Sequence, residues 1–266
     1  MFKTHKVIDA HCHIYPAKIA AKAVEGIGGF YDLKMDEKGI VSDMLEKGER
    51  AGVDRHIVFS VATKPAQVQS INEFIAGEAQ RSGGKLVGLG TVHPDSADMA
   101  GDIAHLKELG LKGIKIHPDF QKTALDDPRF IKMYALCGKE LPVLIHTGDK
   151  RYDYSNPDRM QRVLEMFPDT TFIGAHFGGW SIWEQACDAL AGYENFYVDT
   201  SSSFYALAPE IVEKMIARYG EDHVVFGTDY PMWRADSELE YFSHLNLSDT
   251  AREKILHLNI EKILKI

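Results

Sequence analysis

Several short apolar runs of the sequence end in a histidine or an aspartate. The first run is followed by His11 and His13, which are two residues apart. Side chains two residues apart on a strand project from the same face, so this pair can offer two imidazoles to one ion. Later runs end in His117, His146, His176 and Asp229. Burying several unpaired imidazoles and an acid together is costly, and a bound divalent cation removes that cost.

The mixture of imidazoles with one carboxylate indicates which cation would bind. This mixture suits Zn²⁺ best, and Fe²⁺, Mn²⁺ and Co²⁺ are acceptable in the same geometry. Three or four protein ligands that leave one position open are typical of a catalytic metal site. We therefore expect a divalent cation as cofactor, with Zn²⁺ as the first choice.

The elements that must bring these residues together appear as an alternation of two patterns. Short runs rich in β-branched residues are each followed by a stretch with helical spacing, which is typical of a parallel sheet built from strand and helix units. The predicted strands are residues 7–10, 56–60, 86–92, 113–116, 142–145, 171–175, 196–198 and 224–227. The predicted helices are residues 41–51, 67–81, 97–109, 129–139, 157–167, 182–190, 209–219 and 248–264.

Eight such units in 266 residues fit the α/β fold of a (β/α)₈ TIM barrel, which has about 250 residues. We expect a single domain of this fold over residues 1–266, and a doubly wound open sheet is the structural alternative. In a parallel barrel the C-terminal ends of the strands meet at one mouth, where catalytic groups cluster. The histidines and the aspartate that end five of the eight runs would then share one site.

Charge and cysteine content restrict the partners. Thirty Lys and Arg against 39 Asp and Glu give a net charge of −9, which offers no footprint for nucleic acid or an anionic membrane. Three widely spaced cysteines, Cys12, Cys137 and Cys187, argue against a disulfide framework. The sequence shows no apolar signal-peptide core and no run of about 20 apolar residues. We expect a cytoplasmic protein with a small-molecule substrate.

Four segments carry a family resemblance, namely VIDAHCHIYP, LPVLIHTG, TFIGAHFGG and VVFGTDYP. In this order they resemble the amidohydrolase superfamily, within it the amidohydrolase-related branch that contains aminocarboxymuconate semialdehyde decarboxylase. The resemblance implies a mononuclear centre and allows a homodimer. It also implies metal ligands at His11, His13, His146 and Asp229, and catalytic roles for Asp229, which moves a proton, and for His176.

The fourth run contains a lysine that needs separate treatment. Lys115 and His117 share a face of their strand because they are two residues apart. In binuclear members of the superfamily a carbamylated lysine on this strand bridges two ions, and the alternative is a lysine paired with an acid inside the barrel. His117 departs from the ligand set of the family, so we expect it to contact the substrate or to serve the structure.

The chemistry that we expect first is hydrolysis. A bound cation of this kind lowers the pKa of water to about 7 and polarises a carbonyl, so the substrate would be a small ester, lactone or amide. The alternative is non-oxidative decarboxylation of an aromatic or unsaturated carboxylic acid. A metal-binding barrel without activity is a third hypothesis. Arginines can clamp a carboxylate and aromatic rings can stack on a planar substrate, so substrate contacts are expected at His117, Arg151, Trp180 and Arg234.

Overall fold

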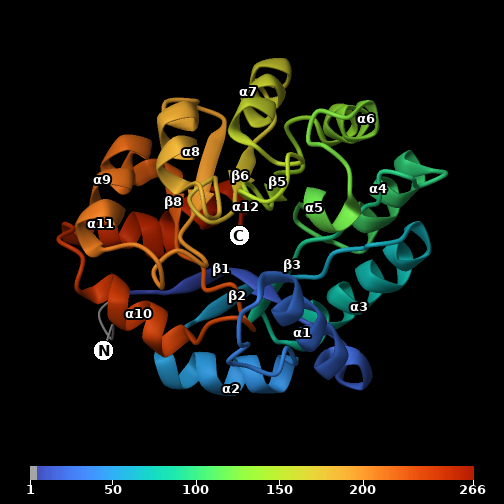
Figure 1. Cartoon of the computed structure of the whole chain (residues 1–266). Helices are drawn as coiled ribbons and strands as arrows, with labels where there is room; N and C mark the ends of the chain where they lie inside the picture. The colour runs from blue at the N-terminus through green and yellow to red at the C-terminus, as the bar shows by residue number, and fades with distance from the viewer. Residues whose placement is uncertain (1–4) are drawn as a thin grey trace.

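A set of eight parallel strands forms the centre of the part of the chain that the structure describes. The computed structural model describes residues 5–266. Its strands are β1 (Ile8–His13), β2 (Arg55–Phe59), β3 (Leu86–Gly88), β4 (Ile114–Ile116), β5 (Val143–Ile145), β6 (Phe172–Gly174), β7 (Phe196–Asp199) and β8 (Val224–Val225). They pair in sequence order as one arc of β1 to β3 and a second arc of β4 to β8, with helices around them (Figure 1).

Backbone hydrogen bonds close the two arcs into a ring. At one join Lys115 N–H donates to Gly90 O at 2.7 Å, and at the other Ala10 N–H donates to Phe226 O at 2.8 Å. An open sheet would leave two unpaired edges. The closure confirms the predicted (β/α)₈ barrel and excludes the open-sheet alternative.

The helices follow the strands in alternation, as the sequence predicts. Predicted helices 41–51 and 209–219 match the structure at both ends, and five others agree within two residues. The helices are α1 (Ala17–Tyr31), α2 (Val41–Ala51), α3 (Val68–Arg81), α4 (Met99–Glu108), α5 (Pro118–Gln121), α6 (Pro128–Cys137), α7 (Pro157–Met166), α8 (Trp183–Leu190), α9 (Pro209–Tyr219), α10 (Ala235–Ser243), α11 (Asp249–Glu253) and α12 (Asn259–Leu264). None of the helices within residues 5–266 has the length and apolar character needed to cross a bilayer.

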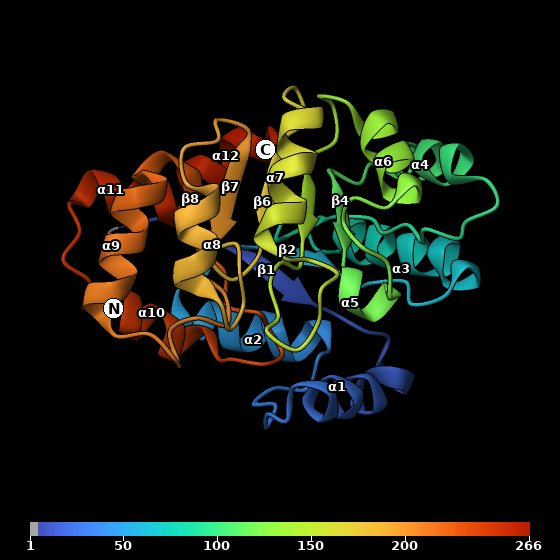
Figure 2. The same cartoon turned by 45° about the horizontal axis from the view of Figure 1, so that its top comes forward.

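Four helical segments differ from the sequence prediction. Helices α1, α5 and α10 are not predicted, and the predicted helix 248–264 is divided by a π-helical segment, η3 (Lys254–Leu258), between α11 and α12. Three glycines lower the helical propensity of α1, so tertiary packing has to support it. Figure 2 shows α1 standing off the ring of the other helices.

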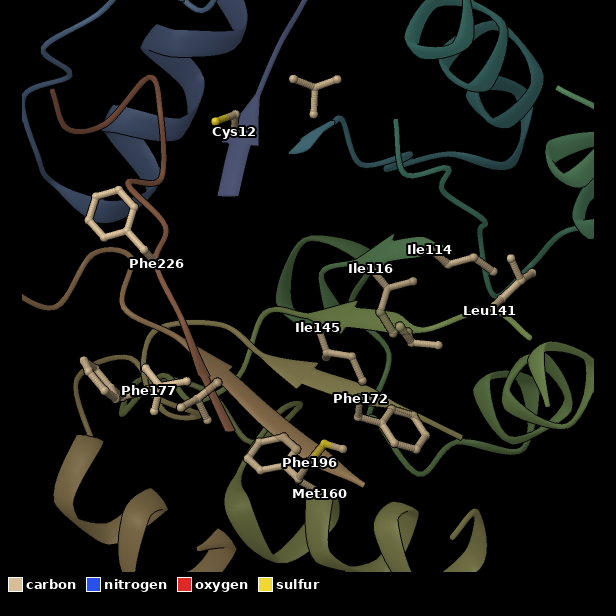
Figure 3. Close-up of a cluster of buried hydrophobic side chains, with 14 of the residues drawn as sticks. Cys12, Ile114, Ile116, Leu141, Ile145, Met160, Phe172, Phe177, Phe196 and Phe226 are labelled. Carbon is tan, nitrogen blue, oxygen red and sulfur yellow. The ribbon is translucent and has the colours of Figure 1, made fainter. Parts of the chain in front are cut away.

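Side chains alternate between two apolar layers along the strands. Leu144, Ile173 and Tyr197 are register neighbours that point into the barrel, and Lys115 occupies the matching position on β4. Ile260 and Leu264 of α12 belong to the same inner cluster. The alternate positions point outward into a larger cluster between strands and helices, part of which is shown in Figure 3. The inner layer of the barrel is therefore largely apolar, and Lys115 is a fully buried charged group within it.

Candidate functional site

His11 and His13 lie on the same side of β1, as the spacing predicts, and their Nε2 atoms are 3.3 Å apart. A bulge in β1 decides which side they reach. Between Asp9 and Cys12, three steps along β1 match two steps along β2. The extra residue turns both imidazoles into the barrel, while Cys12 packs in the outer cluster. Bulges re-aim side chains in this way beside active sites.

Asp229 follows β8 and lies against this histidine pair. Its Oδ1 is 3.3 Å from His11 Nε2 and 3.6 Å from His13 Nε2, and its Oδ2 accepts a hydrogen bond from Ser202 at 2.5 Å. Asp229 has a φ of 67°, Ser202 of 45° and His176 of 60°. Such backbone costs on the order of 1–3 kcal/mol per residue and is found mainly where function demands it. Three of the eight non-glycine residues with positive φ within residues 5–266 therefore belong to this site.

Asp199 determines which nitrogen of His11 faces Asp229 and His13. Its Oδ2 lies 2.7 Å from His11 Nδ1, and because a carboxylate only accepts, Nδ1 carries the proton. The lone pair on His11 Nε2 therefore faces the Asp229 carboxyl group, and a cation between these two acceptors would relieve their repulsion. Ligands about 2.0–2.2 Å from a tetrahedral ion are about 3.4 Å apart. The observed separations of 3.3–3.6 Å fit a divalent cation.

Lys115 completes this charged group inside the barrel. Its side chain is fully buried, and its Nζ lies 3.4 Å from His11 Nε2 and 5.1 Å from the centre of the Phe59 ring. Burial lowers the pKa of Lys115, and the carboxylates of Asp199 and Asp229 oppose that shift. Burial also raises the pKa of Asp229. These surroundings favour a lysine that balances acids inside the barrel over a bridging carbamate.

A second set of side chains continues from the first through hydrogen bonds. His176 Nε2 lies 3.1 Å from His146 Nδ1. The Tyr31 hydroxyl lies 3.4 Å from His146 Nε2 and 2.8 Å from His117 Nε2. The rings of His117 and His146 stack with centroids 3.9 Å apart. Burial lowers the pKa of all three imidazoles, so each is neutral and carries one N–H.

Within residues 5–266, three buried groups of side chains could hold an ion, and the ligand atoms of each group lie within 4.8 Å of one another. Two of these groups belong to this site, namely His11, His176 and Asp229, and His117, Asp119 and His146. The third consists of Asp9, Cys12 and His56. The family resemblance implies that His146 shares an ion with His11, but its nitrogens contact His176, Tyr31 and Asp119. Its role as a metal ligand therefore stays a prediction.

One cavity of about 350 Å³ connects both groups. Lys115 and all the predicted catalytic and metal-binding residues line it, together with His117. Its remaining walls are apolar or aromatic and consist of Ile27, Tyr31, Met35, Phe120, Pro231 and Met232. Ile27 and Tyr31 belong to α1, so the helix that stands off the ring in Figure 2 closes this cavity.

The other predicted substrate contacts lie outside the cavity lining. The Arg151 guanidinium binds Asp149 and donates to Phe30 O at 2.6 Å. It lies over the ring of Trp180 at 5.4 Å, and both pack around Tyr31. Arg234 is half exposed and paired with Asp236. Arg151 and Trp180 therefore support the residue that lines the cavity, and Arg234 is not brought to it.

Sequence reasoning missed three residues of the site. Asp199 directly follows the apolar run of β7, just as the predicted site residues follow theirs, so the same rule would have found it. Asp119 lies two residues after His117 and is buried, and its Oδ1 has no hydrogen-bond partner within residues 5–266. Tyr31 gives no comparable signal because it ends a helix that the sequence pattern does not predict.

Solved structures with this fold cover almost the entire chain. An uncharacterized TIM-barrel protein from Bordetella bronchiseptica aligns with a TM-score of 0.82 at 22% identity over 98% of each chain. A 2,6-dihydroxybenzoate decarboxylase from Rhizobium aligns with a TM-score of 0.73 at 16% identity over 98% of this chain and 99% of its own.

A third such structure contains a metal ion. It is a 5-carboxyvanillate decarboxylase from Novosphingobium aromaticivorans complexed with manganese, with a TM-score of 0.77 at 18% identity over 100% of this chain and 97% of its own. Because the sequence identities of these three structures are only 16–22%, the comparison shows that the chain shares their fold and nothing more specific.

Sequence comparison identifies the family. No curated protein sequence matches the chain, but a family model described as Amidohydrolase matches residues 8–266. Apart from Val7, the match covers all four segments that carry the resemblance, and it confirms the resemblance. The chain belongs to the amidohydrolase family.

Proposed function

We propose that this protein is a metal-dependent, non-oxidative decarboxylase of a small planar carboxylic acid. The observation that carries the proposal is the cavity, which sets candidate cation ligands opposite apolar and aromatic walls. The carboxylate of such a substrate suits the side of the cavity that can hold a cation, and its planar apolar body suits the apolar and aromatic walls. Structural likeness over the full chain to decarboxylases of aromatic acids supports this choice over hydrolysis.

The residues divide the reaction between them. A divalent cation held by His11, His13 and Asp229 would bind the anionic group of the substrate and stabilise negative charge that develops next to it. The bond between the carboxylate carbon and the carbon skeleton breaks, its electron pair stays on the skeleton, and carbon dioxide leaves. A proton then takes the vacated position. Solvent restores that proton to the protein after the product has left.

We assign delivery of the proton to Asp229. Its carboxyl group lines the cavity, and the hydroxyl of Ser202 holds its Oδ2. Trp233 Nε1–H in turn donates to Ser202 Oγ at 2.8 Å, which fixes the position of that hydroxyl. Positioned acids of this kind typically contribute about 10²–10⁴-fold to a rate.

Hydrolysis is the second candidate, because Asp229 could accept a proton from water with the same geometry. Its substrate would be a small ester, lactone or amide. The apolar walls favour decarboxylation, since that reaction does not consume water. For the cation, the imidazole-rich ligands favour Zn²⁺, whereas the similar decarboxylase was complexed with manganese. Metal analysis of protein purified without chelator decides between the ions.

The decisive experiment compares two substrate panels on the metal-loaded protein. One panel contains aromatic and unsaturated carboxylic acids, assayed for carbon dioxide release in D₂O. The other contains lactones, esters and amides, assayed for acid release. We expect carbon dioxide from the first panel and one deuterium on the vacated carbon of the product. Turnover of the second panel alone would replace decarboxylation by hydrolysis, and metal binding without any turnover would favour a binding barrel.

A further inference from the structure

The side chain of Met35 lies at the boundary between the cavity and the solvent. Met35 lines the cavity, yet it is only half-buried. Met232, the other methionine of the lining, is 3% exposed. A side chain that contacts both the cavity and the solvent forms part of the wall that separates them. The length of the Met35 side chain therefore determines where the cavity ends on this side.

The backbone that carries Met35 is held by hydrogen bonds before and after this residue. Before it, Leu33 N–H donates to Gly28 O of α1 at 3.0 Å. After it, Glu37 N–H donates to Pro231 O at 3.0 Å. These bonds tie residues 32–39 to α1 on one side and to the segment after β8 on the other. Met35 thus lies where these two parts of the cavity wall meet.

The close packing of Met35 on α1 depends on a glycine. Gly28 is buried, and a Cβ atom at this position would lie 3.1 Å from Met35 Cγ and 2.8 Å from Leu33 O. A side chain at position 28 would therefore displace Met35 from the helix, whereas glycine lets Met35 Cγ pack on the helix backbone. Because both the backbone and this carbon of Met35 are held, the rest of its side chain sets the limit of the cavity.

The position of Met35 determines which end of a ligand it meets. His11, His13 and Asp229 line the side of the cavity that can hold a cation, and Met35 belongs with Ile27 to the apolar side. A carboxylate on the cation directs the far end of a planar ligand toward Met35. The cavity of about 350 Å³ is near the lower end of the range of about 300–1,000 Å³ of small-molecule sites. A ligand longer than one ring then reaches this wall.

We propose that Met35 is a specificity residue that sets the largest carboxylic acid the cavity admits, so that a single ring fits and two fused rings are excluded. The inference rests on the proposed function for the choice of a planar carboxylic acid as ligand. Without such a limit the larger acid would bind more tightly, because it buries more apolar surface. A packed wall reverses that order, because a ligand that overfills the site forces side chains out of position.

The test measures binding of benzoate and 2-naphthoate to the Mn²⁺-loaded protein by titration calorimetry. For the unsubstituted protein we expect 2-naphthoate to bind at least about tenfold more weakly than benzoate. Met35→Ala removes the thioether, so 2-naphthoate should then bind at least as tightly as benzoate, while the affinity for benzoate changes by less than about threefold. No preference for benzoate in the unsubstituted protein overturns the inference, and so does a preference that survives in folded Met35→Ala.

Met166→Ala is the matched control. It makes the same change in a methionine of α7 that is 55% exposed and does not line the cavity, so the preference for benzoate should persist. Loss of the preference in this variant would show that it does not depend on Met35. Thermal unfolding checks that Met35→Ala is folded. If it does not fold, Met35→Val, which shortens the side chain but keeps an apolar group, is measured with the same two outcomes.

Failure of this inference can be told apart from failure of the proposed function. A size limit that Met35→Ala removes, without carbon dioxide release from any acid, rejects decarboxylation and retains the specificity residue. Carbon dioxide release by the unsubstituted protein from one-ring and two-ring acids alike rejects the specificity residue and retains decarboxylation. Binding of neither benzoate nor 2-naphthoate overturns the inference, whereas carbon dioxide release from the wider panel of acids still decides the proposed function.

Discussion

The two faces of the cavity are built in different ways. The floor, defined as His11, His13, Lys115, Asp199 and Asp229, comes from β1, β4 and β7 and from the segment after β8, and it is rich in charge and tightly paired. The roof, defined as Ile27, Tyr31 and Met35, comes from α1 and the segment after it. It is apolar except for one hydroxyl. The floor residues lie on barrel strands or directly after one, whereas the roof lies on a peripheral helix that is held in place by side chains such as Arg151 and Trp180.

This difference assigns separate tasks to the two faces. Groups that hold a cation and move a proton must stay within fractions of an ångström, which strand ends in a closed ring provide. Selection of a substrate needs only a shaped wall with a few polar atoms, and such a wall can be carried by a peripheral helix. We therefore expect floor substitutions to change turnover and metal affinity, and roof substitutions to change ligand affinity.

The largest effect is expected on the floor, from Asp229→Asn. An amide cannot deliver or accept the proton that the reaction moves, so kcat should fall by about 10³-fold. Much of the bound metal should remain, because the amide oxygen can still face His11. Steady-state kinetics and metal analysis on the same sample check both parts. Turnover near that of the unsubstituted protein would contradict the assigned role of Asp229 and weaken the distinction between floor and roof.

A smaller effect on the floor is expected from Asp199→Asn. The amide no longer enforces a proton on His11 Nδ1, so the lone pair on Nε2 is no longer guaranteed to face the ion. Loss of such support typically weakens metal binding by about 10–100-fold. Titration with Mn²⁺ measures the change, and Asp236→Asn at the surface serves as the control. Equal affinities in the two variants would show that Asp199 does not support a metal ligand.

On the roof, Arg151→Lys should raise KM by about tenfold and leave kcat within about twofold. Lysine keeps a charge beside the buried Asp149 but cannot also bind Phe30 O in the same geometry. The roof is then correctly closed for a smaller fraction of the time, which reduces apparent affinity. Hydrogen exchange should become faster over residues 17–31 and stay unchanged in β1. A large fall in kcat would instead place Arg151 in the reaction itself.

A buried acid outside both faces gives the smallest effect on activity. Glu238 is 6% exposed, and its Oε2 has no hydrogen-bond partner within residues 5–266. Burial raises the pKa of Glu238 from 4.5 to about 8. Between these values the folded state binds more protons than the unfolded state, so the free energy of unfolding falls as pH rises.

Glu238→Gln should therefore leave turnover unchanged and add stability at pH 8 but not at pH 4. Urea unfolding of both proteins at the two pH values measures the difference. Equal differences at both values would show that Glu238 is not buried as a neutral acid. Loss of activity in this variant would instead show that Glu238 contributes to the reaction together with the floor residues.

How far the sequence predicts this protein depends on the kind of element. Short β-branched runs followed by helical spacing located all eight strands, because a strand buried on both faces needs such runs. The number of these strand and helix units, and the short segments that connect them, favoured a barrel over an open sheet. Helix α1 escaped prediction because its glycines weaken the local signal and its support comes from distant residues such as Arg151 and Trp180.

The same division holds for the site. The residue types and two-residue spacing of His11 and His13, and the placement of His176 and Asp229 after apolar runs, were enough to predict a metal-binding mouth. The pairing of Asp199 with His11 joins residues 188 positions apart, and no local pattern encodes such a contact. Arginines were expected at the substrate because of their chemistry, but only the packing shows that Arg151 is held by Asp149 and Phe30.

The sequence by itself determined the fold class, the family and most of the groups that can do chemistry, because these depend on composition and on spacing along the chain. The tertiary structure alone decided where those groups point. A single extra residue in β1 turns His11 and His13 inward, since one step along a strand reverses the face of every following side chain. It also decided the roof, because the position of Tyr31 over the histidines depends on how α1 packs against loops far away in sequence.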